Sequence, residues 1–526
     1  MSSRSSTPDL PESPNGHESL AGEAGGHETA SREVGRRRFL ELAGLGGLAV
    51  GAAGALGGLD APLAAAAGPT TTTAKRSVRG MPKTVKVGVI APFDGLGAFV
   101  GAIVTRSLDS TMKHIKDAKL YPGIDVQLVK VNAKAEEQAD GTTKAYQQLV
   151  ADPDVIGILW CTPFGLKEAK TSIARDGIPV IAVYNDLWSE GLLYPKGPER
   201  SIFQMYLPDL KAMQQLLKYA KKDRGYTSAG LIYDTITPPA TNTEKYFRLA
   251  AKQAGINVAG VETFNLLSAD YGAQITRLKA AKPQCLLVWG LAENTAGVVK
   301  ALDAIGAGYV DTPTAKGADW HPHVMGSPGG TGEKKWAGLA GDAAKVGSLT
   351  CWYLGGFVGA PDFPIRDWMH KYANTYPTGG EEVPANGLYA LLEASRVSKG
   401  KDRTKMVDAL EKFTGTFAAL QYGWTPKRHL SLTDDQLALV TLEHAEYPGK
   451  TDPPYVGGKE KDLYLQIDPH YFGPTILVRP TRARNTKAYP SAMKTVLEQG
   501  YGVQCTKTPP DALGLKVKMT NACKLH

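Results

Sequence analysis

The chain is poor in cysteine and lacks the short motifs of common hydrolases. It contains five cysteines in 526 residues, an odd number that leaves at least one thiol unpaired. No Gly-x-Ser-x-Gly elbow, His-Glu-x-x-His zinc motif or Cys-x-x-Cys pair occurs anywhere in it. We therefore predict a protein without catalytic residues, bound metal or cofactor.

Long apolar runs are also absent after the first 68 residues. The one run of membrane-spanning length, Phe39 to Leu59, comes directly after Arg36-Arg37-Arg38 and is followed by small residues up to Gly68. That order of basic, apolar and small residues favours an export signal, and the Arg-Arg-x-Phe-Leu pattern resembles the twin-arginine type. A transmembrane anchor is the alternative, although seven glycines and Glu41 in the run disfavour it.

The N-terminal region is thus predicted to have three parts. These are a disordered tail over 1–34, a twin-arginine-type signal peptide over 35–68 and a linker over 69–83. Both flanking segments are rich in Ser, Thr, Pro, Gly and charge, which is typical of disorder. We expect an exported protein, in the periplasm, in the cell envelope or outside the cell.

Positive charge is concentrated rather than spread over a face. The chain has a net charge of +8, and from Ile476 onward nine basic residues stand against two acidic ones. Nucleic-acid binding needs a continuous basic surface, so we predict no nucleic-acid partner.

Cys505 and Cys523 lie close together in this basic tail, where a cross-link would stabilise a segment with little core, and we predict a disulfide between them. The other three cysteines lie in apolar segments and are expected to be buried.

Strands and helices are predicted to alternate from residue 84 onward. In the first half, strands at Val85–Ile90, Asp125–Val131, Val155–Trp160 and Pro179–Val183 alternate with helices at Gly101–Lys116, Glu136–Ala151 and Gly165–Arg175. The order restarts with strands at Ser228–Tyr233, Asn257–Phe264 and Cys285–Trp289 around helices at Thr243–Ala254 and Ala273–Ala281. Later segments predict a strand near Gly347–Trp352, a helix over Asn386–Lys399 and a hairpin within Phe417–Leu442. This order predicts an α/β fold of two lobes with parallel sheets, each covered by helices on both faces.

Six segments resemble the type I periplasmic binding proteins of the branched-chain amino acid (Leu/Ile/Val) family, the substrate-binding proteins of ABC transporters. They are Val85–Pro92, Asp154–Gly157, Ile178–Ile181, Gln274–Lys279, Gly341–Ala344 and Asn386–Ala394. Their order and spacing carry the resemblance, which covers roughly residues 84–445. It implies two Rossmann-like lobes joined by three hinge crossings, near Tyr206, Trp352 and Leu430, that shut on a ligand.

The resemblance also implies domain limits and partners. Lobe 1 would comprise 84–205 and 353–430, lobe 2 would comprise 206–352 and 431–445, and 446–526 would be an extension packed on lobe 2. The implied function is an extracytoplasmic, monomeric solute-binding protein that delivers a small molecule to an ABC permease. A branched-chain amino acid-binding protein and a sensory ligand-binding protein are the alternatives, and a secreted enzyme is less favoured.

The pocket positions depart from the amino-acid pattern of the family. Relatives place a Ser four residues after the glycine of the third strand, where this chain has Cys161, and an Ala-Thr pair after the fourth strand, where it has Tyr184 to Asp186. Those positions hold the α-carboxylate and ammonium in relatives, and Asp186 would repel a carboxylate. The candidate ligand-binding residues are Phe93, Asp94, Phe99, Trp160, Cys161, Thr162, Tyr184, Asn185, Asp186, Tyr233, Asp234, Trp289 and Glu293.

Aromatic residues, with Trp188 among them, dominate this set. Aromatic rings offer a large apolar surface with a polar edge, so we predict a small aromatic or apolar ligand. The alternative is that some of the rings only pack the lobes.

Two other segments contain residues typical of metal or phosphate sites, but at spacings that do not match those motifs. Asp319–His323 is expected to be an exposed turn rather than a metal site, and Gly326–Lys334 a flexible loop rather than a phosphate site.

Overall fold

The computed structural model describes most of the chain between residues 77 and 442 and three short strands beyond it. The described residues are 77–95, 97–235, 240–265, 268, 270–307, 320–332, 336–340, 343, 349–353, 365–373, 379–415, 422–432, 437–442, 465–467, 470–472 and 475–479. The predicted tail, the signal peptide and the Cys505–Cys523 pair lie outside these residues. Met81, inside the predicted linker, is buried against the core.

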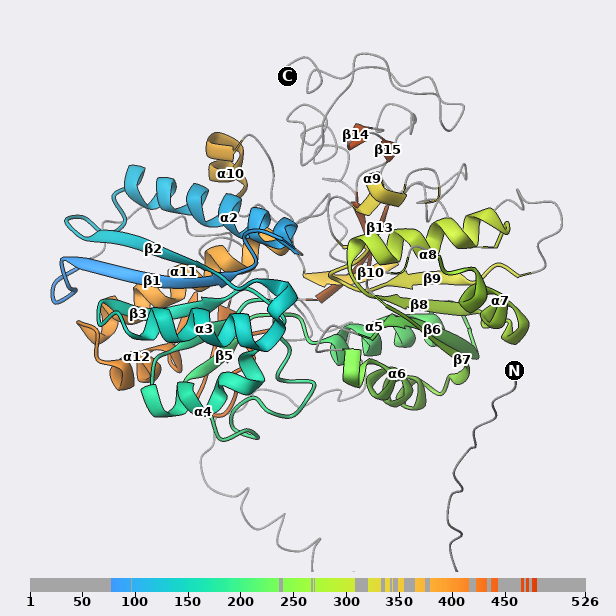
Figure 1. The fold of residues 1–526 in the computed structure, drawn as a ribbon, viewed down its shortest axis with the longest axis horizontal. Helices are drawn as coiled ribbons and strands as arrows, with labels where there is room; N and C mark the ends of the chain where they lie inside the picture. The colour runs from blue at the N-terminus through green and yellow to red at the C-terminus, as the bar shows by residue number, and fades with distance from the viewer. Residues whose placement is uncertain are drawn as a thin grey trace, which may run out of the picture. The chain divides into compact units, whose positions relative to one another are not determined.

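The first lobe is built on a five-stranded parallel sheet (Figure 1). Its order is β2 (Asp125–Asn132), β1 (Thr84–Ala91), β3 (Val155–Trp160), β4 (Val180–Ala182) and β5 (Ile202–Gln204). Every residue of β3 is buried, as expected of a central parallel strand covered on both faces.

Helices cover both faces of this sheet because its side chains alternate. Val87 and Val89 face a core shared with α2 (Ala98–Asp117) and α11 (Gly379–Ser398). Ile90 faces the opposite core, shared with α3 (Gln138–Val150) and α4 (Leu166–Asp176). Figure 1 shows α2 and α3 on opposite sides of β1. The one-turn η1 (Ala135–Glu137), α10 (Ile365–Ala373), α12 (Arg403–Leu410) and the short pair β11 (Thr414–Gly415) and β12 (Tyr422–Gly423) complete this part of the chain.

The second lobe is built on a seven-stranded sheet. Its order is β16 (Thr475–Arg479), β13 (Leu437–Leu442), β10 (Leu349–Tyr353), β9 (His323–Gly326), β8 (Cys285–Trp289), β6 (Ser228–Asp234) and β7 (Asn257–Phe264). The run from β10 to β7 is parallel, whereas β13 is antiparallel to both β10 and β16. The helices between its strands are α5 (Asp209–Lys222), α6 (Ala240–Ala254), α7 (Gly272–Ala281), α8 (Ala292–Ala304) and α9 (Trp336–Ala340), and β14 (Leu465–Ile467) pairs with β15 (His470–Phe472).

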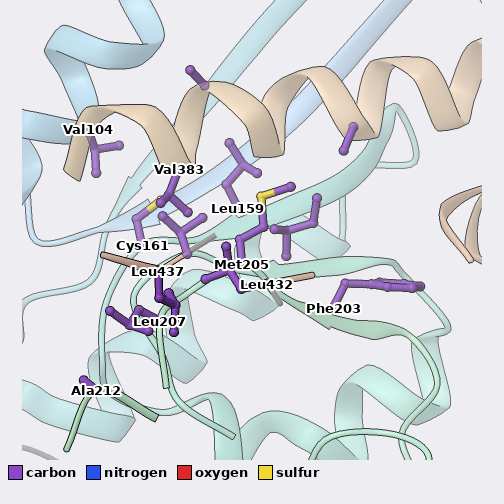
Figure 2. Close-up of a cluster of buried hydrophobic side chains, with 14 of the residues drawn as sticks. Val104, Leu159, Cys161, Phe203, Met205, Leu207, Ala212, Val383, Leu432 and Leu437 are labelled. Atoms are coloured by element: carbon purple, nitrogen blue, oxygen red, sulfur yellow. The ribbon is translucent and has the colours of Figure 1, made fainter. Parts of the chain in front are cut away.

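The chain crosses between the lobes three times. It leaves the first sheet after β5 for α5, returns after β10 to α10, and leaves again after Leu430, which forms a β-bridge with Gln204, the last residue of β5. Figure 2 shows apolar side chains of the first and third crossings, Met205 and Leu432 among them, packed with Leu159 of β3. The prediction of two α/β lobes joined by a three-crossing hinge is confirmed.

Four local predictions differ from the structure. In the described part of Phe417–Leu442 the predicted hairpin is reduced to one antiparallel bridge between Thr425 and Arg428, because β13 pairs with β10 and β16 and β12 pairs with β11. Helix α11 begins at Gly379, upstream of the predicted Asn386, and contains Pro384. The other two concern segments of the second lobe that were predicted to be exposed or flexible.

Neither of those segments is loose where the structure describes it. In the predicted exposed turn at Asp319–His323, His323 begins β9 and is buried between two tyrosine rings. In the predicted flexible loop at Gly326–Lys334, the Ser327 hydroxyl donates to the Gly290 carbonyl at 2.7 Å. Both segments contribute to the packing of the second sheet.

Candidate functional site

The carboxyl ends of the parallel strands collect the candidate residues along one edge of each sheet. In the first sheet, the register places Trp160 of β3 beside Ile90 of β1 and Ala182 of β4. In the second sheet, Tyr233 of β6 pairs with Trp289 of β8. Open parallel sheets bind ligands at this edge, beyond the strand ends. The residues that follow each strand are therefore the candidate site.

The loop after β1 is held by the end of the neighbouring strand. The Phe93 backbone N–H donates to the Asn132 side-chain oxygen at 2.8 Å, and the Asn132 amide donates to the Asp94 carboxylate at 2.5 Å. Phe93 is half-buried and Asp94 is exposed. Asn132 was missed in the sequence, where its signal is a polar residue that ends an alternating strand.

Helix α2 approaches the same loop through a glycine. A Cβ added at Gly101 would lie 2.7 Å from the Cα of Phe93, closer than real Cβ atoms approach. The missing side chain lets the first turn of α2, which carries half-buried Phe99, pack directly on the loop.

The residues at the end of β3 form a buried floor. The Trp160 ring is fully buried, and its indole N–H donates to the Phe164 carbonyl at 2.9 Å. Cys161 is equally buried, and burial raises the pKa of its thiol, which keeps it neutral and unreactive. Thr162 is buried, with its hydroxyl 3.4 Å from the Phe164 backbone N–H that donates to it. Trp160 and Cys161 thus belong to the hydrophobic core. This agrees with the alternative that some of the candidate residues only pack the lobes.

Tyr184 lies after β4 and reaches the start of α11. Its hydroxyl donates to the Gly380 carbonyl at 2.6 Å. In a regular helix that carbonyl would accept from the N–H four residues on, but Pro384 has none. The half-buried Tyr184 ring is therefore anchored by a carbonyl that the proline leaves open, while the neighbouring Asn185 side chain donates to the Pro163 carbonyl at 2.8 Å.

Asp186 is 5% exposed and is held by protein donors. One carboxylate oxygen accepts from the Ser189 N–H at 3.0 Å and the Gln204 side-chain amide at 3.1 Å. The other accepts from the Asp209 N–H at 2.8 Å. Burial raises the pKa of Asp186, and these hydrogen bonds oppose that rise.

Gln204, which sequence reasoning missed, is the fully buried partner of that carboxylate. Its side-chain oxygen accepts from the backbone N–H groups of Leu187 and Trp188, at 2.9 and 3.0 Å. Its amide donates to Asp186 and to the Tyr206 carbonyl at 3.2 Å. The only signal in the sequence is a polar residue at the end of the apolar strand β5.

The second lobe contributes two aromatic residues and a buried acid. The half-buried Tyr233 has its hydroxyl 3.5 Å from Glu244, and burial, followed by the Glu244 charge, raises the pKa of Tyr233. Trp289 is buried and its side chain hydrogen-bonds the carboxyl group of Asp209, the first residue of α5. Burial, and then the charge of Asp186, raise the pKa of Asp209 well above its ordinary value.

The structure thus brings only part of the predicted set together. Asp186 contacts Asp209, which contacts Trp289, so that a chain of contacts runs from the first lobe to the second. Asp234 is buried near Asp209, whose pKa its charge also raises, whereas Glu293 is exposed in the first turn of α8. Asn132, Gln204 and Asp209 are the residues that the sequence did not point to.

Relatives match most of the described chain. A family model described as a periplasmic binding protein matches residues 84–431. The Leu/Ile/Val-binding protein homolog 7 of Brucella suis is 22% identical over 337 residues, which cover 62% of this chain and 80% of that protein.

Solved structures share the fold at low identity. The leucine-binding protein LivK of Thermotoga maritima is similar with a TM-score of 0.55 at 14% identity, covering 69% of this chain and 96% of its own. A solute-binding protein of an ABC transporter from Rhodopseudomonas palustris, solved with 3,4-dihydroxybenzoic acid, gives a TM-score of 0.58 at 16% identity, covering 76% and 100%. Since the family model spans well over half of the sequence and the two-lobed fold agrees with it, the chain belongs to the periplasmic binding protein family.

Proposed function

We propose that the chain is an extracytoplasmic solute-binding protein of an ABC-type importer, which captures a small aromatic or apolar ligand between its lobes by hinge closure. One observation carries the proposal: aromatic side chains stand at the carboxyl edge of both sheets. Phe93 and Tyr184 follow strands of the first sheet, while Tyr233 is the penultimate residue of β6 and Trp289 the last residue of β8 in the second. Closure would be driven by contacts that the ligand makes with both sheet edges only in the closed form.

The proposed ligand contacts are the candidates at these edges other than Trp160, Cys161 and Asp186. Rings supply apolar area, and the polar residues orient the ligand. The set is Phe93, Asp94, Phe99, Thr162, Tyr184, Asn185, Tyr233, Asp234, Trp289 and Glu293. The domain limits proposed with it are 84–205 and 353–430 for lobe 1, 206–352 and 431–445 for lobe 2, and 446–526 for an extension on lobe 2.

Two observations favour an aromatic ligand over a branched-chain amino acid. The related Rhodopseudomonas palustris protein was solved with an aromatic acid, so this fold accommodates one. The positions expected to hold an amino acid's charged groups are occupied differently here, since Cys161 is buried and Asp186 is hydrogen-bonded to protein groups through both carboxylate oxygens. The Brucella suis relative keeps the amino-acid alternative open to test.

Tryptophan fluorescence titration tests the ligand class. The panel would contain 4-hydroxybenzoate, 3,4-dihydroxybenzoate, neutral phenols, leucine and isoleucine. We expect saturable binding of an aromatic compound, weakened about tenfold by Tyr233→Leu, a loss of about 1.4 kcal/mol. The matched control is Tyr226→Leu, since Tyr226 precedes the amino end of the same strand. Tight leucine binding without any response to aromatic compounds would contradict the proposal.

Export and partners are part of the same proposal. A twin-arginine signal over 35–68 would deliver a folded monomer outside the cytoplasm, where an ABC permease, or a sensor in the alternative, would receive the closed form. Within the described residues, the structure has no helix both long and apolar enough to cross a membrane. The double variant Arg36→Lys, Arg37→Lys should block export and so tests the signal. Light scattering measures the mass and tests the monomer. Mass spectrometry of the recovered ligand tests whether the protein leaves it chemically unchanged.

A further inference from the structure

Helix α5 begins immediately after the first crossing and lacks a cap of its own. Its N-cap residue is Pro208, which makes no side-chain capping hydrogen bond. The first N–H groups of any helix have no partner within the helix and need acceptors from elsewhere. In α5 the first two of those groups belong to Asp209 and Leu210.

The acceptors come from the other lobe. The Asp209 N–H donates to the Asp186 carboxylate at 2.8 Å, and the Leu210 N–H donates to the Ser189 hydroxyl at 3.2 Å. Both acceptors lie in the loop after β4 of the first lobe, whereas α5 packs on α6 and β10 of the second. A negative charge at a helix N-terminus is also favoured by the helix dipole.

The carboxylate that caps α5 is fixed to the crossings themselves. Gln204 donates to Asp186 through its side chain, and its backbone N–H donates to the His429 carbonyl at 2.8 Å. The Gln204 carbonyl accepts from the Ser431 N–H at 3.0 Å and the Trp424 indole at 3.3 Å. One buried glutamine thus connects the first crossing, the third crossing and the cap.

We propose that Asp186 is a positioning residue of the hinge rather than a ligand contact. Its carboxylate caps α5 across the lobe boundary and so makes the start of α5 the pivot about which the lobes turn. Its two oxygens accept three hydrogen bonds from protein groups and the residue is buried, so it offers little access to a ligand donor. The cap lies within a few residues of the crossing, so it can persist while more distant parts of the lobes move. This inference rests on the proposed closure.

The test compares two helix caps that differ in location. Asp186→Asn keeps the shape but removes one acceptor oxygen of the cap between lobes. Asp402→Asn makes the same change in the cap of α12, where the Asp402 side chain accepts from the Lys405 N–H at 3.0 Å within the first lobe, and so removes a negative charge that the helix dipole favours. We expect both variants to melt at lower temperature, and only Asp186→Asn to bind ligand at least about fivefold more weakly.

A readout without ligand separates this inference from the proposed function. Spin labels at Lys116→Cys on α2 and Lys252→Cys on α6 would report the distance between the lobes by electron paramagnetic resonance. We expect Asp186→Asn to broaden the ligand-free distance distribution and Asp402→Asn to leave it unchanged. Equal distributions and equal affinities in the two variants would overturn the hinge role. Failure of the wild-type chain to bind any ligand would instead overturn the proposed function, while a broadened distribution would still support the pivot.

Discussion

The Tyr184 hydroxyl donates to the Gly380 carbonyl, the one that Pro384 leaves without its regular helical partner. A proline in the second turn of α11 thereby creates the acceptor that orients an aromatic side chain at the carboxyl edge of the first sheet. A candidate site residue is positioned here by a proline in a helix about 200 residues further along the chain.

A double-mutant cycle measures that relationship. Tyr184→Phe removes the donor and is expected to cost about 1 kcal/mol in the free energy of unfolding, measured in urea. Pro384→Ala returns an N–H to the helix, which gives the Gly380 carbonyl a second partner. In that background the cost of Tyr184→Phe should fall to about half or less. Equal costs in both backgrounds would contradict the coupling.

Asp209 predicts an unusual pH dependence of stability. Its pKa is raised well above the ordinary value by burial and then by the charge of Asp186, so the folded protein binds a proton there more tightly than the unfolded chain. Its contribution to stability is therefore complete below the unfolded pKa and is lost as pH rises through the folded pKa.

Asp209→Asn removes this titration and keeps an acceptor for the Trp289 side chain. The variant should gain melting temperature relative to the wild type as pH rises from about 4 to 8. Thermal unfolding at several pH values measures the difference. A difference that stays constant over this range would refute the prediction, and Asp94→Asn, an exposed acid, serves as the control.

Gly101→Ala should disturb the loop after β1. The added methyl group would meet the Phe93 Cα at 2.7 Å, so the loop must shift, at a cost of about 1–3 kcal/mol that the better helix propensity of alanine only partly offsets. We expect weaker ligand binding together with the loss of stability. Gly272→Ala is the control, because its Cβ would meet only the Asp270 carboxylate, at 3.3 Å. Equal behaviour of the two variants would contradict the argument.

Local patterns predicted the parallel part of the fold well, for physical reasons. Segments such as Val155–Trp160 are apolar throughout, which is typical of strands covered on both faces, and the structure has the strand at those bounds. The antiparallel strand β13 was misassigned to a hairpin because its partners, β10 and β16, are distant in sequence. The early start of α11 was hidden by Gly379, Gly380 and Pro384, residues that disfavour a helix on propensity alone.

The candidate site was predictable only where position along a strand decides it. Tyr233 and Trp289 lie at the carboxyl ends of neighbouring parallel strands, within one residue of the strand limits, so their pairing could be predicted. The contacts of Asp186 do not follow from any local pattern, since its donors include Gln204 at the end of the next strand, β5, and Asp209 at the start of α5. Asp186 was therefore predicted to be a ligand contact, because its hydrogen-bond donors could not be identified from the sequence.

Small-angle X-ray scattering of the purified exported protein, with and without the ligand found by titration, tests the central claim most directly. The account predicts that saturating ligand lowers the radius of gyration and that the ligand is recovered chemically unchanged. Stoichiometric binding with an unchanged radius of gyration, or conversion of the ligand to a product, would contradict it.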